Sequence, residues 1–190
     1  MKIFFSILLV CLICSVCPKS YAIQEDFVRI KEISDSVIKD CKTDEDKVIA
    51  LSHFVHTKLQ PDESKIPANA VMSTVDRLDA GVGFCNHQVA VFMRLCEAQK
   101  IKTRMLYLLN KEGTSSPHTI GEAWVNSRWV IVDPIFDLNI RNALGELISL
   151  RDVYKDVNIL KGCPALKARG DVDKFIDNFL NPMMFVYGLE

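Results

Sequence analysis

Residues 118–134 read HTIGEAWVNSRWVIVDP, and they give the clearest structural signal in the chain. Two runs rich in β-branched and aromatic residues, His118–Val125 and Arg128–Asp133, are separated only by Asn126-Ser127. Runs of this composition favour strands, and two polar residues between such runs favour a tight turn. The stretch therefore predicts a hairpin of two antiparallel strands.

The register of this hairpin brings a histidine and a carboxylate together. A two-residue turn places Val125 opposite Arg128. The same register places His118 opposite Ile135, which is two residues from Asp133 on the same face. His118 and Asp133 are then diagonal neighbours, about 7–8 Å apart at Cα and within side-chain reach. A shift by one residue would move Asp133 to the other face, so the prediction depends on the turn.

Upstream of the hairpin, Cys85 follows a predicted turn and lies at the start of a predicted helix. Residues 80–83, Ala-Gly-Val-Gly, predict the turn. Beyond it, an apolar stripe at helical spacing consists of Cys85, Val89, Phe92 and Cys96. A thiol in the first helical turn meets unpaired N–H groups and the positive end of the helix dipole, which favour the thiolate. Cys85 is thus a candidate nucleophile; a small buried residue that begins a core helix is the alternative interpretation.

Cysteine, histidine and carboxylate are together the groups that thiol catalysis needs. An imidazole takes the thiol proton or pairs with the thiolate, and a carboxylate fixes the tautomer and orientation of the ring. In this assignment Cys85 attacks a carbonyl carbon, His118 protonates the leaving group and Asp133 orients His118. N–H groups at the start of the cysteine helix would hold the oxyanion.

Metal binding is the competing interpretation of these residues. Ligand types occur at Cys85, His87, His118 and Asp133, and at the helical pair His53 and His56. However, the chain has no Cys-x-x-Cys or His-Glu-x-x-His motif. Cys85 and His87, two apart on a helix, face nearly opposite directions and would not share one ion. We therefore predict no metal and no cofactor, and surface or packing roles for His53, His56 and His87.

Three separated segments resemble the motifs of one known family. They are Gly81-Val82-Gly83-Phe84-Cys85, His118-Thr119-Ile120-Gly121-Glu122 and Trp129-Val130-Ile131-Val132-Asp133-Pro134. In this order they are similar to the nucleophile, histidine and aspartate segments of bacterial transglutaminase-like domains. Similar residues also occur at Ala90, Leu95, 101–104 and 145–152. The resemblance covers about residues 46–152.

The resemblance implies an α+β, papain-like fold, in which N-terminal helices and a nucleophile-bearing helix pack on an antiparallel sheet. It also implies Cys85, His118 and Asp133 as catalytic residues. The family includes proteases, amidases and cross-linking acyltransferases. Two departures stand out. No side-chain oxyanion donor is evident, with Asn69 and Asn86 as candidates beside the backbone N–H of Cys85. His87 occupies a position where an acidic or small residue is more usual.

The rest of the chain predicts helices before the hairpin and weaker signals after it. The expected helices lie at 24–41, between Thr43 and Pro61, at 71–78 and at 85–100, and further ones begin after Ser149 and Asp171. A strand is expected at 103–110. Helices first and strands afterwards are typical of an α+β domain. Trp124 and Trp129 flank the hairpin turn and are expected to stack on each other or in the core.

The first 22 residues read as an export signal. Lys2 gives a positive start, residues 3–16 are almost all apolar, and Ser20-Tyr21-Ala22 suits a signal peptidase. The apolar run holds about 14 residues, whereas a membrane-spanning helix needs about 20. We therefore expect a signal peptide at 1–22 and a single exported domain at 23–190, either periplasmic or secreted. An uncleaved anchor is the alternative, and only then would the chain contact a membrane.

The net charge limits the classes of binding partner, and the cysteine content limits the disulfides that can form. The formal net charge of −1 at pH 7 gives no electrostatic footprint for nucleic acid. Beyond residue 22 the cysteines are Cys41, Cys85, Cys96 and Cys163. An exported protein meets an oxidising compartment, but a working Cys85 must stay free. At most one disulfide then joins two of the other three, and three buried thiols are the alternative.

The sequence thus predicts an exported, transglutaminase-like cysteine enzyme that catalyses thiol-dependent acyl transfer or amide hydrolysis. Its expected partner is a peptide or protein substrate, such as a cell-envelope component. The alternative is an exported binding or assembly module that keeps the fold without turnover.

Overall fold

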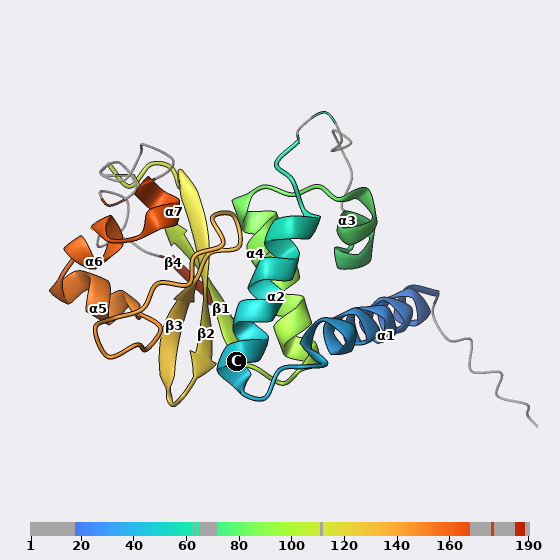
Figure 1. Cartoon of the computed structure of the whole chain (residues 1–190). Helices are drawn as coiled ribbons and strands as arrows, with labels where there is room; N and C mark the ends of the chain where they lie inside the picture. The colour runs from blue at the N-terminus through green and yellow to red at the C-terminus, as the bar shows by residue number, and fades with distance from the viewer. Residues whose placement is uncertain are drawn as a thin grey trace, which may run out of the picture.

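In the computed structural model, helices occupy the first half of the chain and a sheet begins at residue 103 (Figure 1). The structure describes residues 18–62, 64, 72–110, 112–167, 176 and 185–188. The first helices are α1 (Pro18–Ile38), α2 (Asp44–Lys58), α3 (Thr74–Ala80) and α4 (Cys85–Ala98). The strands are β1 (Thr103–Leu108), β2 (His118–Val125), β3 (Arg128–Val132) and β4 (Phe185–Gly188). Between β3 and β4 lie α5 (Leu150–Lys155), α6 (Asn158–Lys161) and α7 (Pro164–Lys167). This order confirms the predicted α+β class.

The sheet has the strand order β3-β2-β1-β4, and every adjacent pair is antiparallel. Val125 pairs with Arg128 across the two-residue turn, which confirms the predicted register of the hairpin. The turn residues Asn126 and Ser127 have φ of 50° and 61°, the left-handed values that a tight hairpin turn of this kind needs. Trp124 pairs with Trp129, and their rings meet edge to face at 5.4 Å between centroids. With Trp124 42% exposed, the pair stacks at the surface rather than in the core.

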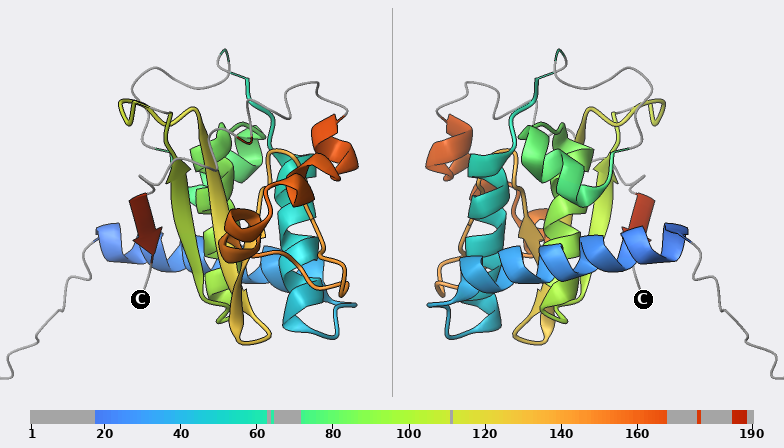
Figure 2. Two further views of the ribbon diagram at one scale, coloured as in Figure 1. Left: turned by 90° about the vertical axis from the view of Figure 1, so that its left-hand side faces the viewer. Right: turned by 90° about the vertical axis from the view of Figure 1, so that its right-hand side faces the viewer.

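Helices cover both faces of the sheet. Figure 1 shows α2 and α4 on one side and α5 to α7 on the other, and Figure 2 shows α1 running across α2 and α4. The core beneath α4 includes Val89 and Phe92, both fully buried. A Cβ on Gly121 of β2 would lie only 3.5–3.6 Å from these two side chains. These are ordinary van der Waals distances, so the cysteine-bearing helix packs directly on β2 at Gly121.

Capping residues fix where three helices begin. The Thr43 hydroxyl accepts the N–H of Asp46 at 3.0 Å, and the Asp46 carboxylate accepts the N–H of Thr43 at 3.1 Å. Ser149 caps α5 in the same manner, so both predicted caps are confirmed. The helix expected at 71–78 begins later, at Thr74, because Ser73 caps it. The helix expected after Asp171 lies largely outside the described residues.

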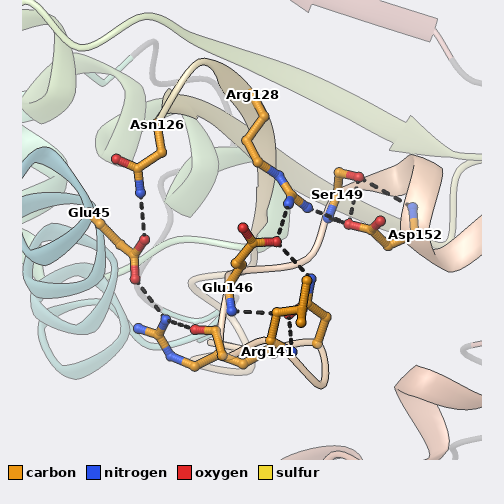
Figure 3. A network of polar contacts seen from close by, with 10 residues as sticks. Glu45, Asn126, Arg128, Arg141, Glu146, Ser149 and Asp152 are labelled. Atoms are coloured by element: carbon orange, nitrogen blue, oxygen red, sulfur yellow. Dashed lines mark hydrogen bonds and ion pairs between the residues drawn. The ribbon is translucent and has the colours of Figure 1, made fainter.

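A polar network ties the far end of the hairpin to its neighbours (Figure 3). Arg128 pairs with Glu146 at 2.9 Å and with Asp152, the residue that completes the cap of α5. Glu45 on α2 accepts a bond from Asn126 at 2.9 Å and pairs with Arg141 at 2.7 Å. The network spans α2, the hairpin turn, the 138–149 loop and α5. It therefore restrains the hairpin at the end opposite to His118.

Two polar side chains fix the start of α4. The ring Nδ1 of His87 accepts the backbone N–H of Phe84 at 3.3 Å, although His87 was expected only to pack or face solvent. The buried Gln88 donates from Nε2 to the carbonyls of Leu59 and Gly83, at 3.1 and 3.0 Å. These bonds hold the chain immediately before Cys85 against the first turn of its helix.

The His87 ring must be neutral at Nδ1 to accept this bond. Burial lowers the pKa of His87, and the nearby Arg77 cation lowers it further. The positive end of the helix dipole also disfavours a cation in the first turn. The cap is therefore intact at neutral pH and is lost when the ring takes a second proton.

The described cysteines Cys41, Cys85, Cys96 and Cys163 are all free thiols, so the structure contains none of the disulfides that the sequence left open. Cys96 and Cys163 are buried, whereas Cys41 and Cys85 are half-buried. In the part of the chain that the structure describes, no helix combines the length and apolar character needed to cross a membrane. Residues 1–17 are not among those described, so export stays a prediction.

Phe92→Ala should test the core between α4 and the sheet. Phe92 is 0% exposed, and its loss should lower the free energy of unfolding by about 3–5 kcal/mol in urea denaturation. Phe27→Ala on α1 is the control, because Phe27 is 49% exposed and its change should stay within about 0.5 kcal/mol. Equal effects of the two substitutions would contradict the packing described above.

His87→Ala should lower the free energy of unfolding by about 1 kcal/mol through loss of the cap. His87→Asn should restore most of it, because the amide oxygen can accept the Phe84 N–H. As pH falls below the ordinary histidine value of about 6.5, the unfolded chain takes up the proton first and stability decreases. Urea denaturation from about pH 7.5 to about 5.5 should therefore show a steeper loss for wild type than for His87→Asn. Parallel curves would refute the neutral cap.

Candidate active site

The predicted histidine and carboxylate meet across the hairpin. His118 Nε2 lies 2.7 Å from Asp133 Oδ2, and the two residues are 6% and 0% exposed. Because the carboxylate accepts this bond, Nε2 carries a proton. The other ring nitrogen, Nδ1, is left to interact with the thiol.

The turn that follows β3 holds the carboxylate in place. Asp133 Oδ1 accepts the backbone N–H groups of Ile135 and Phe136, at 3.1 and 3.3 Å. The ring of Phe136 also stacks on His118, with 4.8 Å between centroids and 25° between planes. One short turn therefore fixes both the carboxylate and one face of the imidazole. Phe136 was not predicted as a site residue, because neither its type nor its spacing distinguishes it in the sequence.

Cys85 reaches the same place from α4. It is the first residue of that helix, and its thiol hydrogen-bonds the His118 imidazole and Thr119. As the first helical residue, Cys85 has an N–H group with no carbonyl acceptor inside its own helix. That N–H group could receive a developing oxyanion next to the sulfur. The structure thus brings Cys85, His118 and Asp133 together.

The electrostatics favour transfer of the thiol proton to the imidazole. Burial raises the pKa of the Cys85 thiol, but the His118 and Thr119 hydrogen bonds and the His118 charge outweigh it, leaving the pKa below its ordinary value. Burial lowers the pKa of His118, yet the Asp133 carboxylate and Cys85 outweigh burial and raise it to about 9. The ring is therefore protonated at pH 7. Cys41 differs, because burial and nearby carboxylates raise the pKa of its thiol.

The other candidate residues have separate places. Asn86 is half-buried beside Cys85, and Asn69 is outside the described residues. His53 Nδ1 donates to Asp137 at 2.8 Å, and His56 Nδ1 donates to the Pro134 carbonyl at 2.9 Å. Within the described ranges no three His, Cys, Asp or Glu residues are grouped so as to hold a metal ion.

Gln88, which braces the turn before Cys85, was missed by the sequence reasoning. A polar residue one helical turn after the nucleophile, on the buried side of an apolar helix, is the signal that could have found it. Its Oε1 is buried and has no partner among the described residues. The amide therefore serves as a donor to the carbonyls of Leu59 and Gly83 rather than as half of a reciprocal pair.

A solved structure shares this fold over part of its length. A structure of a candidate cysteine protease from Cytophaga hutchinsonii has a TM-score of 0.50 and 17% sequence identity, and the match covers 64% of this chain and 40% of that chain. A structure of a TGase has a TM-score of 0.45 and 17% identity, with 66% and 34% covered. The chain spans less than half the length of these matched chains, and likeness at this identity shows the fold alone. A comparison with curated protein sequences gives no match.

The family follows from the sequence itself. The family model described as the Transglutaminase-like superfamily matches residues 31–134, more than half of the chain. This range runs from the middle of α1 through the hairpin and the residue after Asp133. The match agrees with the resemblance found in the three sequence segments and with the observed fold. The chain belongs to the Transglutaminase-like superfamily.

Proposed function

We propose that this protein is a cysteine-nucleophile enzyme that transfers or hydrolyses an acyl group, with Cys85, His118 and Asp133 as its catalytic residues. One observation carries the proposal. His118 donates from Nε2 to a fully buried carboxylate while its ring also hydrogen-bonds the thiol of a residue at a helix start. Membership of the superfamily supports an enzyme of this kind.

Each group has a defined part in the proposed reaction. The Cys85 thiolate attacks the carbonyl carbon of an amide or ester, and the N–H of Cys85 stabilises the oxyanion. The His118 imidazolium then protonates the leaving amine or alcohol, which leaves an acyl-enzyme. Water or an amine, deprotonated by the now neutral His118, releases the acyl group. Asp133 accepts the bond from Nε2 and keeps that proton of His118 in place throughout.

The proposed substrate is a peptide or protein. Hydrolysis needs water at the acyl-enzyme, and transfer needs an amine in its place. Action outside the cytoplasm is part of the proposal and rests only on the character of residues 1–22. The two outcomes of the acyl-enzyme are separated by measuring release of acid and incorporation of a primary amine in one assay.

Alkylation by iodoacetamide should reveal the thiolate. Because the pKa of Cys85 is lowered while that of Cys41 is raised, Cys85 should keep reacting as pH falls, when Cys41 slows about tenfold per unit. Peptide mass spectrometry measures both rates in one sample. His118→Gln removes the cation and should slow Cys85 at about pH 6.5 by at least about tenfold, with Cys41 unchanged. Equal pH profiles of the two thiols would contradict the ion pair.

Turnover should depend on Cys85 alone among the accessible thiols. Cys85→Ala should lower the release or transfer of acyl groups from a mixture of denatured-protein peptides by at least about 10³-fold. Cys41→Ala, at the other half-buried thiol, should keep the wild-type rate. A peptidyl chloromethylketone should label wild type and Cys41→Ala but not Cys85→Ala. Absence of turnover and of labelling in wild type would instead favour a binding module that keeps the fold.

A further inference from the structure

The helix α2 contacts the turn that carries the carboxylate of the site. His53 and His56 are three residues apart, so they lie on one face of α2. His53 Nδ1 lies 2.8 Å from Asp137 Oδ2, and His56 Nδ1 lies 2.9 Å from the carbonyl oxygen of Pro134. The pair His53-x-x-His56, singled out in the sequence as a weak metal signal, therefore holds the first and last residues of the turn at 134–137.

The turn at 134–137 positions two groups that contact the His118 ring, the Asp133 carboxylate and the Phe136 ring. Its Ile135 and Phe136 N–H groups bind Asp133 Oδ1, and the Phe136 ring stacks on His118. The turn is closed by the N–H of Leu138, which donates to the carbonyl of Asp133 at 3.1 Å. A displacement of the turn would thus move the carboxylate and uncover one face of the ring together.

The conformation of the 134–137 turn has an energy cost at Asp137. Asp137 has φ of 49°, a left-handed conformation that costs energy for a residue with a side chain. Its Oδ1 is buried and has no partner among the described residues. Contacts from outside the turn must offset this cost, and α2 supplies two of them.

The two histidines do not contribute equally. The side chain of His53 is 60% exposed, so its pair with Asp137 is screened by water and weak. His56 is half-buried, and it donates to a carbonyl that can only accept. Nδ1 of His56 must therefore carry a proton, and it does so in both the neutral and the charged ring.

We propose that His56 is a positioning residue of the reaction, which acts through the Pro134–Asp137 turn to keep the Asp133 carboxylate directed at His118. The inference rests on the proposed function, because it assigns a role in that site. Among the described residues, the charged or titratable groups that face the turn include His53 and His56 from α2, Asp137 within it, and Asp133 and His118 from the hairpin.

The test follows the Cys85 thiolate rather than turnover. His56→Leu keeps a side chain of similar bulk but has no donor, whereas the amide nitrogen of His56→Asn takes the place of Nδ1. Loss of the donor should loosen the Asp133–His118 contact and weaken the imidazolium. Alkylation of Cys85 at about pH 6 should then slow about tenfold in His56→Leu, the effect of a one-unit rise in thiol pKa.

The controls separate positioning from general damage. His56→Asn should stay within about twofold of wild type, and so should His53→Ala, which removes the exposed partner of the same turn. Urea denaturation checks that each variant is folded. An unchanged Cys85 profile in folded His56→Leu, or failure of His56→Asn to restore it, would overturn the proposal.

A measurement on the wild-type protein needs no variant. Nitrogen-15 chemical shifts of the histidine rings at about pH 7.5 should place a proton on Nδ1 of His56, the state expected for a donor to a carbonyl. An unprotonated Nδ1 would refute the bond itself. If the chain shows no turnover but the alkylation profile shifts as expected, the proposed function fails and the role of His56 in holding the pair stands.

Discussion

The hydrogen bond between His118 and Asp133 depends on the number of residues in the turn between β2 and β3. With two residues in the turn, the imidazole and the carboxylate share a face and come within 2.7 Å. One residue more would send the carboxylate to the opposite face. The rest of the site is arranged around this pair, because α4 brings the thiol to it and α2 supports the turn behind it.

The hairpin and several of the helices could be predicted because their signals are local. Strand composition and an Asn-Ser turn predict β2 and β3. Thr43 and Ser149 mark the starts of α2 and α5, because each side chain accepts the backbone N–H of the residue three positions ahead. The resemblance of three segments to one family then placed Cys85 near His118, which no local pattern could do. These local signals and this resemblance explain why the fold could be predicted correctly from the sequence.

Other features have no local signal. The strand β4 has four residues and pairs with β1 about 80 positions earlier, so neither period nor turn chemistry indicates it. The short helices α6 and α7 likewise have no local sequence pattern that predicts them. His56 was predicted to have a surface or packing role, because a contact with Pro134, 78 residues away, leaves no sign in the local sequence. His87 was expected to pack or to face solvent, yet its half-buried ring accepts the backbone N–H of Phe84, the residue before the helix. Polar contacts between distant segments decide these roles.

The pairing of β4 with β1 has a consequence for the behaviour of the chain in solution. Without it, β1 would present a free row of backbone N–H and C=O groups along Arg104–Tyr107, the kind of border that recruits strands from other molecules. Residues 185–188 occupy that border from within the same chain. The edge of the sheet then passes to β4, whose four residues are fewer than the six of β1, and a shorter edge strand offers fewer backbone groups to other chains.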